Sequence, residues 1–62
     1  MLLREIEQFL RRENMHASRL GRIVVKDPGL VRDMRNGREP RVATAAKLRA
    51  FMAGYQGEAA NA

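Results

Sequence analysis

The chain has 62 residues, with no cysteine and no long apolar run. Without cysteine it has no disulfide to stabilise its fold and no thiolate cluster to bind a metal. Apolar runs such as residues 23–25 fall far short of the roughly 20 residues that a membrane-spanning helix needs. Charged residues close to the N-terminus do not match a signal peptide. We therefore expect a cytoplasmic protein without a membrane partner.

The sequence also offers little for catalysis. His16 is the single histidine, and no serine–base pair or carboxylate cluster accompanies it. The five glycines are spread along the chain rather than gathered into a phosphate-binding loop. We expect a protein that is not an enzyme and needs no cofactor or metal.

Apolar residues recur at helical spacing along most of the chain, and no segment alternates as a strand would. This pattern predicts an all-α fold, a compact bundle of about four short helices. We expect the helices at residues 2–13, 17–25, 28–36 and 42–53, and we expect Gly54 to stop the last of them. The expected core is Leu3, Ile6, Leu10, Leu20, Val24, Val31, Leu48 and Phe51. Residues 1–55 form the predicted domain, and residues 56–62 a short flexible C-terminal tail.

Two of these helices are predicted to pack across a tight corner at residues 17–34. Gly21 lies where the first helix must let the second approach closely. We expect Asp27 to be the N-cap of the second helix and Pro28 its first helical residue. Gly37 should end this helix in the left-handed conformation. The arrangement is a helix-turn-helix, whose second helix is shaped to lie in a DNA major groove.

The net charge of +5 is concentrated in one part of the chain. Charges cancel over residues 1–18, residues 19–49 hold nine basic and three acidic side chains, and Glu58 adds one negative charge. Ten of the twelve basic residues are arginine, which suits bidentate contacts to phosphate and guanine. A nucleic-acid partner would explain this excess, but a solvated basic helix surface would explain it equally well.

Residues 6–52 resemble the lambda-repressor-like helix-turn-helix proteins of bacteria and phage. The motifs that carry the resemblance are Leu20-Gly21-Arg22 and Arg35-Asn36-Gly37-Arg38-Glu39-Pro40. The resemblance implies an all-helical domain that binds duplex DNA, commonly as a dimer on a two-fold site, and regulates transcription. The chain departs from the family where His16 replaces a common capping Ser or Thr. It departs again at Val25-Lys26, because many members have glycine in this turn.

If the corner docks on DNA in the usual way, the face of its second helix that points away from Val31 and Met34 meets the bases. The residues predicted to read bases are Gly29, Arg32, Asp33 and Asn36. Arg32 is the strongest candidate, because a guanidinium matches the O6 and N7 acceptors of guanine. Asn36 could pair with adenine or only end the helix. Asp33 could accept from cytosine N4, or instead hold Arg35 or Arg38 in place.

Phosphate contacts are expected around this face, since about half or more of protein–DNA hydrogen bonds go to the backbone. The residues assigned to them are Ser18, Arg19, Lys26, Arg35, Arg38 and Arg41. A single domain with so few contacts would bind weakly at physiological salt, so we expect a homodimer on a pseudo-palindromic site, associated with the nucleoid. The apolar residues that could form the dimer, or instead complete the monomer's own core, are Leu2, Leu3, Met52 and Tyr55.

A different use of the same helices stays open. The first helix is balanced in charge and opens with Met1-Leu2-Leu3, an apolar edge that another protein could contact. The chain would then be a small protein-interaction adaptor or an antitoxin-like module, and its partner another regulatory protein. A basic surface for anionic membranes is disfavoured, because the charges flank a corner rather than form one helical face.

Overall fold

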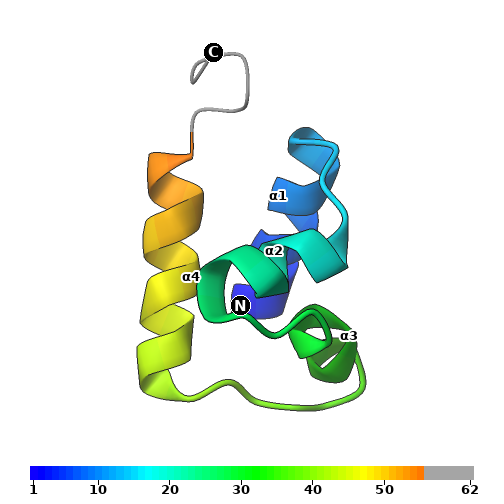
Figure 1. The fold of residues 1–62 in the computed structure, drawn as a ribbon, viewed down its shortest axis with the longest axis vertical. Helices are drawn as coiled ribbons and strands as arrows, with labels where there is room; N and C mark the ends of the chain where they lie inside the picture. The colour runs from blue at the N-terminus through cyan, green and yellow to red at the C-terminus, as the bar shows by residue number, and fades with distance from the viewer. Residues whose placement is uncertain (56–62) are drawn as a thin grey trace.

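The computed structural model describes residues 1–55, which form four helices (Figure 1). The helices are α1 (Leu2–Arg12), α2 (Ala17–Val25), α3 (Leu30–Arg35) and α4 (Val42–Gly54). No strand occurs within residues 1–55, so the predicted all-α bundle is confirmed. None of the four helices is long and apolar enough to cross a lipid bilayer. The predicted tail, residues 56–62, lies outside the described residues.

The helices pack so that α3 and α4 lie on opposite sides of the domain in the view of Figure 1. Both α1 and α2 contact α3 as well as α4, and so hold the two sides together. The connector, residues 36–41, runs along one edge of the domain from the end of α3 to the start of α4. One face of α3 is therefore left without a covering helix.

Apolar residues from all four helices form a single core. Its buried members are Ile6, Phe9, Leu10, Met15, Leu20, Leu30, Val31, Met34 and Leu48. Five of the eight predicted core residues are among them, and the other three, Leu3, Val24 and Phe51, pack against the core half-buried. The predicted list omitted the other four buried residues, which are Phe9, Met15, Leu30 and Met34.

The end of α1 explains why Met15 is buried. Asn14 has a φ of 51°, which is the left-handed conformation. The Asn14 N–H donates to the Arg11 carbonyl at 3.3 Å, and the Met15 N–H to the Leu10 carbonyl at 2.9 Å. This is the Schellman arrangement, in which the residue after the left-handed cap packs back against the last apolar turn of the helix. Met15 therefore belongs to the core although it lies between two helices.

Three aromatic rings close the end of the core where α1 and α4 meet. The ring centroid of Phe9 lies 6.1 Å from that of Phe51 and 5.3 Å from that of Tyr55, both near perpendicular. Such pairs contribute about 0.5–1.5 kcal/mol beyond the area they bury. Leu2, Leu3 and Met52 also pack against the core. The apolar residues that could have formed a dimer surface thus complete the core of the monomer.

The two glycines expected to stop helices behave differently. Gly37 has a φ of 108°, and its N–H donates to the Met34 carbonyl at 3.1 Å, so it caps α3 as predicted. Gly54 instead is the last helical residue, and the chain leaves α4 at Tyr55 in an extended conformation. The glycine stop predicted for α4 is therefore wrong by one residue.

Candidate nucleic-acid interface

The corner between α2 and α3 depends on Gly21. A Cβ on this buried glycine would overlap the Asp27 carbonyl oxygen and would lie 3.2 Å from Leu30 Cβ. The Asp27 N–H donates to the Gly21 carbonyl at 3.1 Å, so the two backbones are hydrogen-bonded where they approach. Lys26 makes the turn with a φ of 57°, a conformation that glycine adopts at less cost. The close approach predicted at Gly21 is confirmed.

The carboxylate of Asp27 caps the turn that leads into α3. Its Oδ1 accepts a hydrogen bond from the Gly29 N–H at 3.1 Å, and its backbone carbonyl accepts one from the Leu30 N–H at 3.1 Å. The α-helix begins at Leu30 with Gly29 as N-cap, and Pro28 lies in the turn. The prediction of Asp27 as N-cap and Pro28 as first helical residue is wrong by two residues, because Asp27 forms an Asx turn ahead of the helix.

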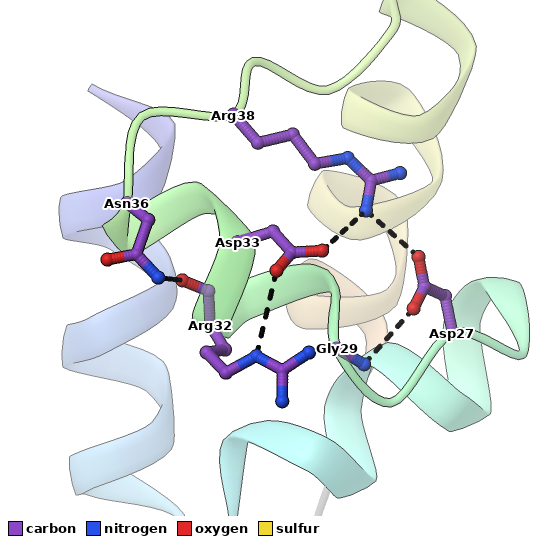
Figure 2. Close-up of polar contacts among 6 residues, drawn as sticks. All are labelled: Asp27, Gly29, Arg32, Asp33, Asn36 and Arg38. Atoms are coloured by element: carbon purple, nitrogen blue, oxygen red, sulfur yellow. Dashed lines mark hydrogen bonds and ion pairs between the residues drawn. The ribbon is translucent and has the colours of Figure 1, made fainter.

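The helix α3 buries its apolar residues and leaves a polar face open. Leu30, Val31 and Met34 are buried. The side chain of Arg32 is 75% exposed and that of Asp33 is 41% exposed. Figure 2 shows these two side chains on the side of α3 that faces Gly29 and Asp27, with Asn36 at the helix end. The four residues predicted to read bases thus lie outside the core, on and beside one short helix.

These four residues also contact one another. Arg32 Nε lies 3.6 Å from Asp33 Oδ1, and Asn36 Nδ2 donates to the Arg32 carbonyl at 3.1 Å. The guanidinium of Arg32 lies above Gly29, since a Cβ on this glycine would be 2.9 Å from Arg32 Nη2. Of the two roles considered for Asn36, the structure shows the contact at the helix end.

Arg38 ties the connector to α3 (Figure 2). Its Nη1 donates to Asp27 Oδ2 at 3.0 Å and to Asp33 Oδ2 at 3.3 Å. The hydrogen bond to Asp27, followed by the one to Asp33, raises the pKa of the Arg38 guanidinium above its ordinary value. Pairing between Asp33 and Arg38 was one of the predicted alternatives. The contact with Asp27 was not predicted, because it depends on how the connector folds back over the corner.

Arg35 joins α3 to α1 rather than pointing away from the protein. Its Nε donates to Glu7 Oε2 at 2.7 Å and its Nη2 to Glu7 Oε1 at 2.6 Å, a bidentate pair. This hydrogen bonding lowers the pKa of the Glu7 carboxyl, and it raises the pKa of Arg35. Sequence reasoning missed Glu7, because no local spacing indicates a pair 28 residues apart.

The other predicted phosphate contacts surround the corner. Ser18 and Arg19 are exposed in the first turn of α2, where the N-cap His16 makes no side-chain capping bond. Lys26 in the turn and Arg41 before α4 are exposed, and neither forms an ion pair with another residue in the range 1–55. Among these cations, Lys26 and Arg41 face solvent, whereas Arg35 and Arg38 are held by carboxylates.

A hollow of about 370 Å³ opens between the start of α1, the end of α3 and the connector. Met1, Leu3 and Met34 form part of its apolar wall, and Arg38 and Arg49 contribute charge. Met1 is 89% exposed, so this wall is open to solvent. The predicted apolar edge at the start of the chain is therefore part of a concave surface.

Comparisons of the chain with protein-family models, with curated proteins and with solved structures each found no match. Function must therefore be argued from the residues and from their arrangement.

Proposed function

We propose that the protein binds duplex DNA sequence-specifically, places α3 in the major groove and acts as a transcriptional regulator on the nucleoid. One observation carries this proposal. The Arg32 side chain is 75% exposed on a helix whose opposite face is buried against α1 and α2. In a helix-turn-helix, the second helix is held in this way by the first and presents its outer side chains to base edges. Arginine is the side chain best suited to guanine there.

The positions of two motif glycines support the resemblance to lambda-repressor-like proteins. Gly21 lies where α2 and α3 approach most closely, and a side chain would overlap the Asp27 backbone there. Gly37 has a φ of 108° and caps α3. Both positions favour glycine for a physical reason, so the motif falls where a compact corner requires it.

Phosphate binding in this proposal rests first on two exposed cations, Lys26 and Arg41. In the sequence Lys26 precedes α3 and Arg41 follows it. The start of α2, with Ser18 and Arg19, adds backbone N–H groups and a further charge. To bind a phosphate, Arg38 would have to release the carboxylates of Asp27 and Asp33. The net charge of +6 over residues 19–49 favours the approach of DNA to this side.

We also propose that two copies bind one pseudo-palindromic site. A two-fold axis would place the two α3 helices one turn of DNA apart, roughly 34 Å. Because the apolar ends of α1 and α4 complete the monomer's core, the pairing surface has to include apolar residues that stay exposed. Those are Met1 and Val42, each 89% exposed, and Ile23, 46% exposed. Equal affinity for a half-site and a full inverted repeat, with one chain per duplex on both, would exclude the dimer.

The test of DNA binding compares three single variants on a selected site and on random duplex. Arg32→Ala should cost about 1–3 kcal/mol on the selected site and much less on random DNA. Arg41→Ala should weaken both by a similar factor. Arg12→Gln is the matched control, because it removes one charge at the end of α1 that lies away from α3 in Figure 1. If Arg32→Ala weakens both duplexes equally, the base-reading role of α3 is wrong.

The hollow beside Met1 supports a second candidate function, a protein-interaction adaptor. Its apolar wall at the start of α1 could receive a side chain of another regulatory protein or of a toxin. Replacing Lys26, Arg32 and Arg41 together with glutamate would separate the two functions, because Glu7 and Arg35 are left to hold the fold. Loss of duplex binding by a folded variant supports DNA binding, whereas a wild-type protein that binds no duplex favours the adaptor.

A further inference from the structure

The exposed part of α3 presents one hydrogen-bond donor group directly beside one acceptor group. Arg32 Nε lies 3.6 Å from Asp33 Oδ1, and both side chains are substantially exposed. Arg38 Nη1 fixes the second oxygen of the carboxylate, Asp33 Oδ2, at 3.3 Å (Figure 2). The Asp33 carboxylate therefore lies next to the Arg32 guanidinium, and its second oxygen accepts a hydrogen bond from Arg38.

The guanidinium of Arg32 keeps its guanine-reading atoms available. Its ion pair with Asp33 uses Nε, so both terminal nitrogens lie outside the pair. Gly29 leaves the space that the guanidinium occupies, because a Cβ there would come within 2.9 Å of Nη2. A fork of two N–H donors matches guanine, whose O6 and N7 are both acceptors in the major groove.

The carboxylate of Asp33 can only accept hydrogen bonds, which limits the bases it tolerates. Guanine and thymine present acceptors in the major groove and repel it. Adenine presents a donor at N6 but also an acceptor at N7 beside it. Cytosine presents its N4 donor without a neighbouring acceptor, so it is the base that a carboxylate favours.

The remaining polar residue of this face, Asn36, is held at the end of the helix. Asn36 would need its amide nitrogen and its amide oxygen together to match adenine N7 and N6. In the structure the nitrogen, Nδ2, donates to the Arg32 carbonyl at 3.1 Å. One of the two N–H groups of Nδ2 is used in this bond, which fixes the Asn36 amide against the end of its own helix.

We propose that α3 recognises G·C base pairs, with a guanine read by Arg32 and a cytosine read by Asp33, in the same pair or in adjacent pairs. The proposal rests on the DNA-binding function proposed above, and it names the bases that this function selects. Arg38 acts here as a positioning residue, because its guanidinium donates a hydrogen bond to Asp33 Oδ2 and so orients the carboxylate.

The experiment is a selection from duplexes with a randomised central segment, followed by affinity measurements on the enriched sequence and its single-base variants. The wild-type protein should enrich one or two adjacent G·C pairs in each half-site. Arg32→Ala should reduce discrimination at the guanine by about 5- to 150-fold and leave the cytosine preference in place. Asp33→Asn should shift the preference at the cytosine toward adenine, because an amide matches adenine N6 and N7.

Lys47→Ala is the control, since it removes an exposed charged side chain of α4 and should leave the selected bases unchanged. Thermal melts establish that each variant is folded. Enrichment of A·T pairs alone, or an unchanged preference in Asp33→Asn, overturns the base assignment while duplex binding stands. Absence of binding to any duplex in the pool overturns the DNA-binding function itself, and with it this inference.

Discussion

Replacing Gly21 with alanine tests the corner on which the interface depends. In the middle of a helix, alanine is favoured over glycine by about 0.5–1 kcal/mol. Here the added Cβ would overlap the Asp27 carbonyl oxygen and sit 3.2 Å from Leu30 Cβ, and a backbone atom cannot move aside alone. Overpacking lowers the free energy of unfolding by about 1–3 kcal/mol. Weakening the hydrogen bond from the Asp27 N–H to the Gly21 carbonyl lowers it by about 0.5–1.5 kcal/mol more. The net expectation is a loss of about 1–3 kcal/mol.

Thermal unfolding followed by circular dichroism measures this loss. Each kcal/mol shifts the Tm of a domain this small by roughly 4–8 °C, so Gly21→Ala should melt at least about 4 °C below the wild type. Gly54→Ala is the matched control: it makes the same change in α4, where nothing lies within 4 Å of the added Cβ. It should stabilise by up to about 1 kcal/mol. If Gly21→Ala melts as high as Gly54→Ala, the helices do not meet at Gly21 as described.

Substitutions at three further positions test the site and its supports. Lys26→Gly should stabilise the fold by about 0.5–1 kcal/mol in thermal melts, since φ is 57° at this position, and it should weaken binding to every duplex. Lys26→Gln should weaken binding in the same way without the gain in stability. Gly29→Ala should change stability by less than about 0.5 kcal/mol but lower specific affinity in a competition assay, because its Cβ displaces the Arg32 guanidinium. Glu7→Gln should cost about 0.2–1 kcal/mol near neutral pH. The pairing with Arg35 lowers the pKa of Glu7. The stability difference between the wild type and Glu7→Gln should therefore be fully present above the ordinary glutamate pKa of about 4.3, and it should disappear as the pH falls through the lowered pKa. A gap between wild type and Glu7→Gln that persists in acid would contradict the ion pair.

The helices and the glycine cap of α3 could be predicted from sequence because their signals are local. Apolar spacing indicates each helix whatever packs against it, and Gly37 follows α3 directly. Asp27 shows where local signals stop being sufficient. An N-cap and an Asx turn both need a carboxylate at that position, and only the packing of Leu30 into the core decides that the α-helix begins there.

Two of the ion pairs could not be predicted from sequence, because each joins elements that the fold brings together. Glu7 and Arg35 are 28 residues apart, and Asp27 and Arg38 are 11 apart. A basic residue near a predicted DNA-binding helix has the same sequence signature whether it contacts phosphate or braces a neighbouring helix. The structure distinguishes the two uses by showing which cations already have a carboxylate partner.

This distinction changes the expected dependence of DNA binding on salt. Each phosphate contact contributes about 0.9 to the slope of log affinity against log salt concentration. Arg35 forms two short hydrogen bonds with Glu7, so moving it to a phosphate would break the link between α1 and α3. We therefore expect Arg35→Gln to leave the slope unchanged although it lowers stability. Arg41→Gln removes an equal charge from a residue without an ion pair in the described chain and should reduce the slope by about 0.9. A drop of about 0.9 in Arg35→Gln would show that Arg35 leaves Glu7 for the DNA, and the structure of α3 in the complex would then differ from the one described.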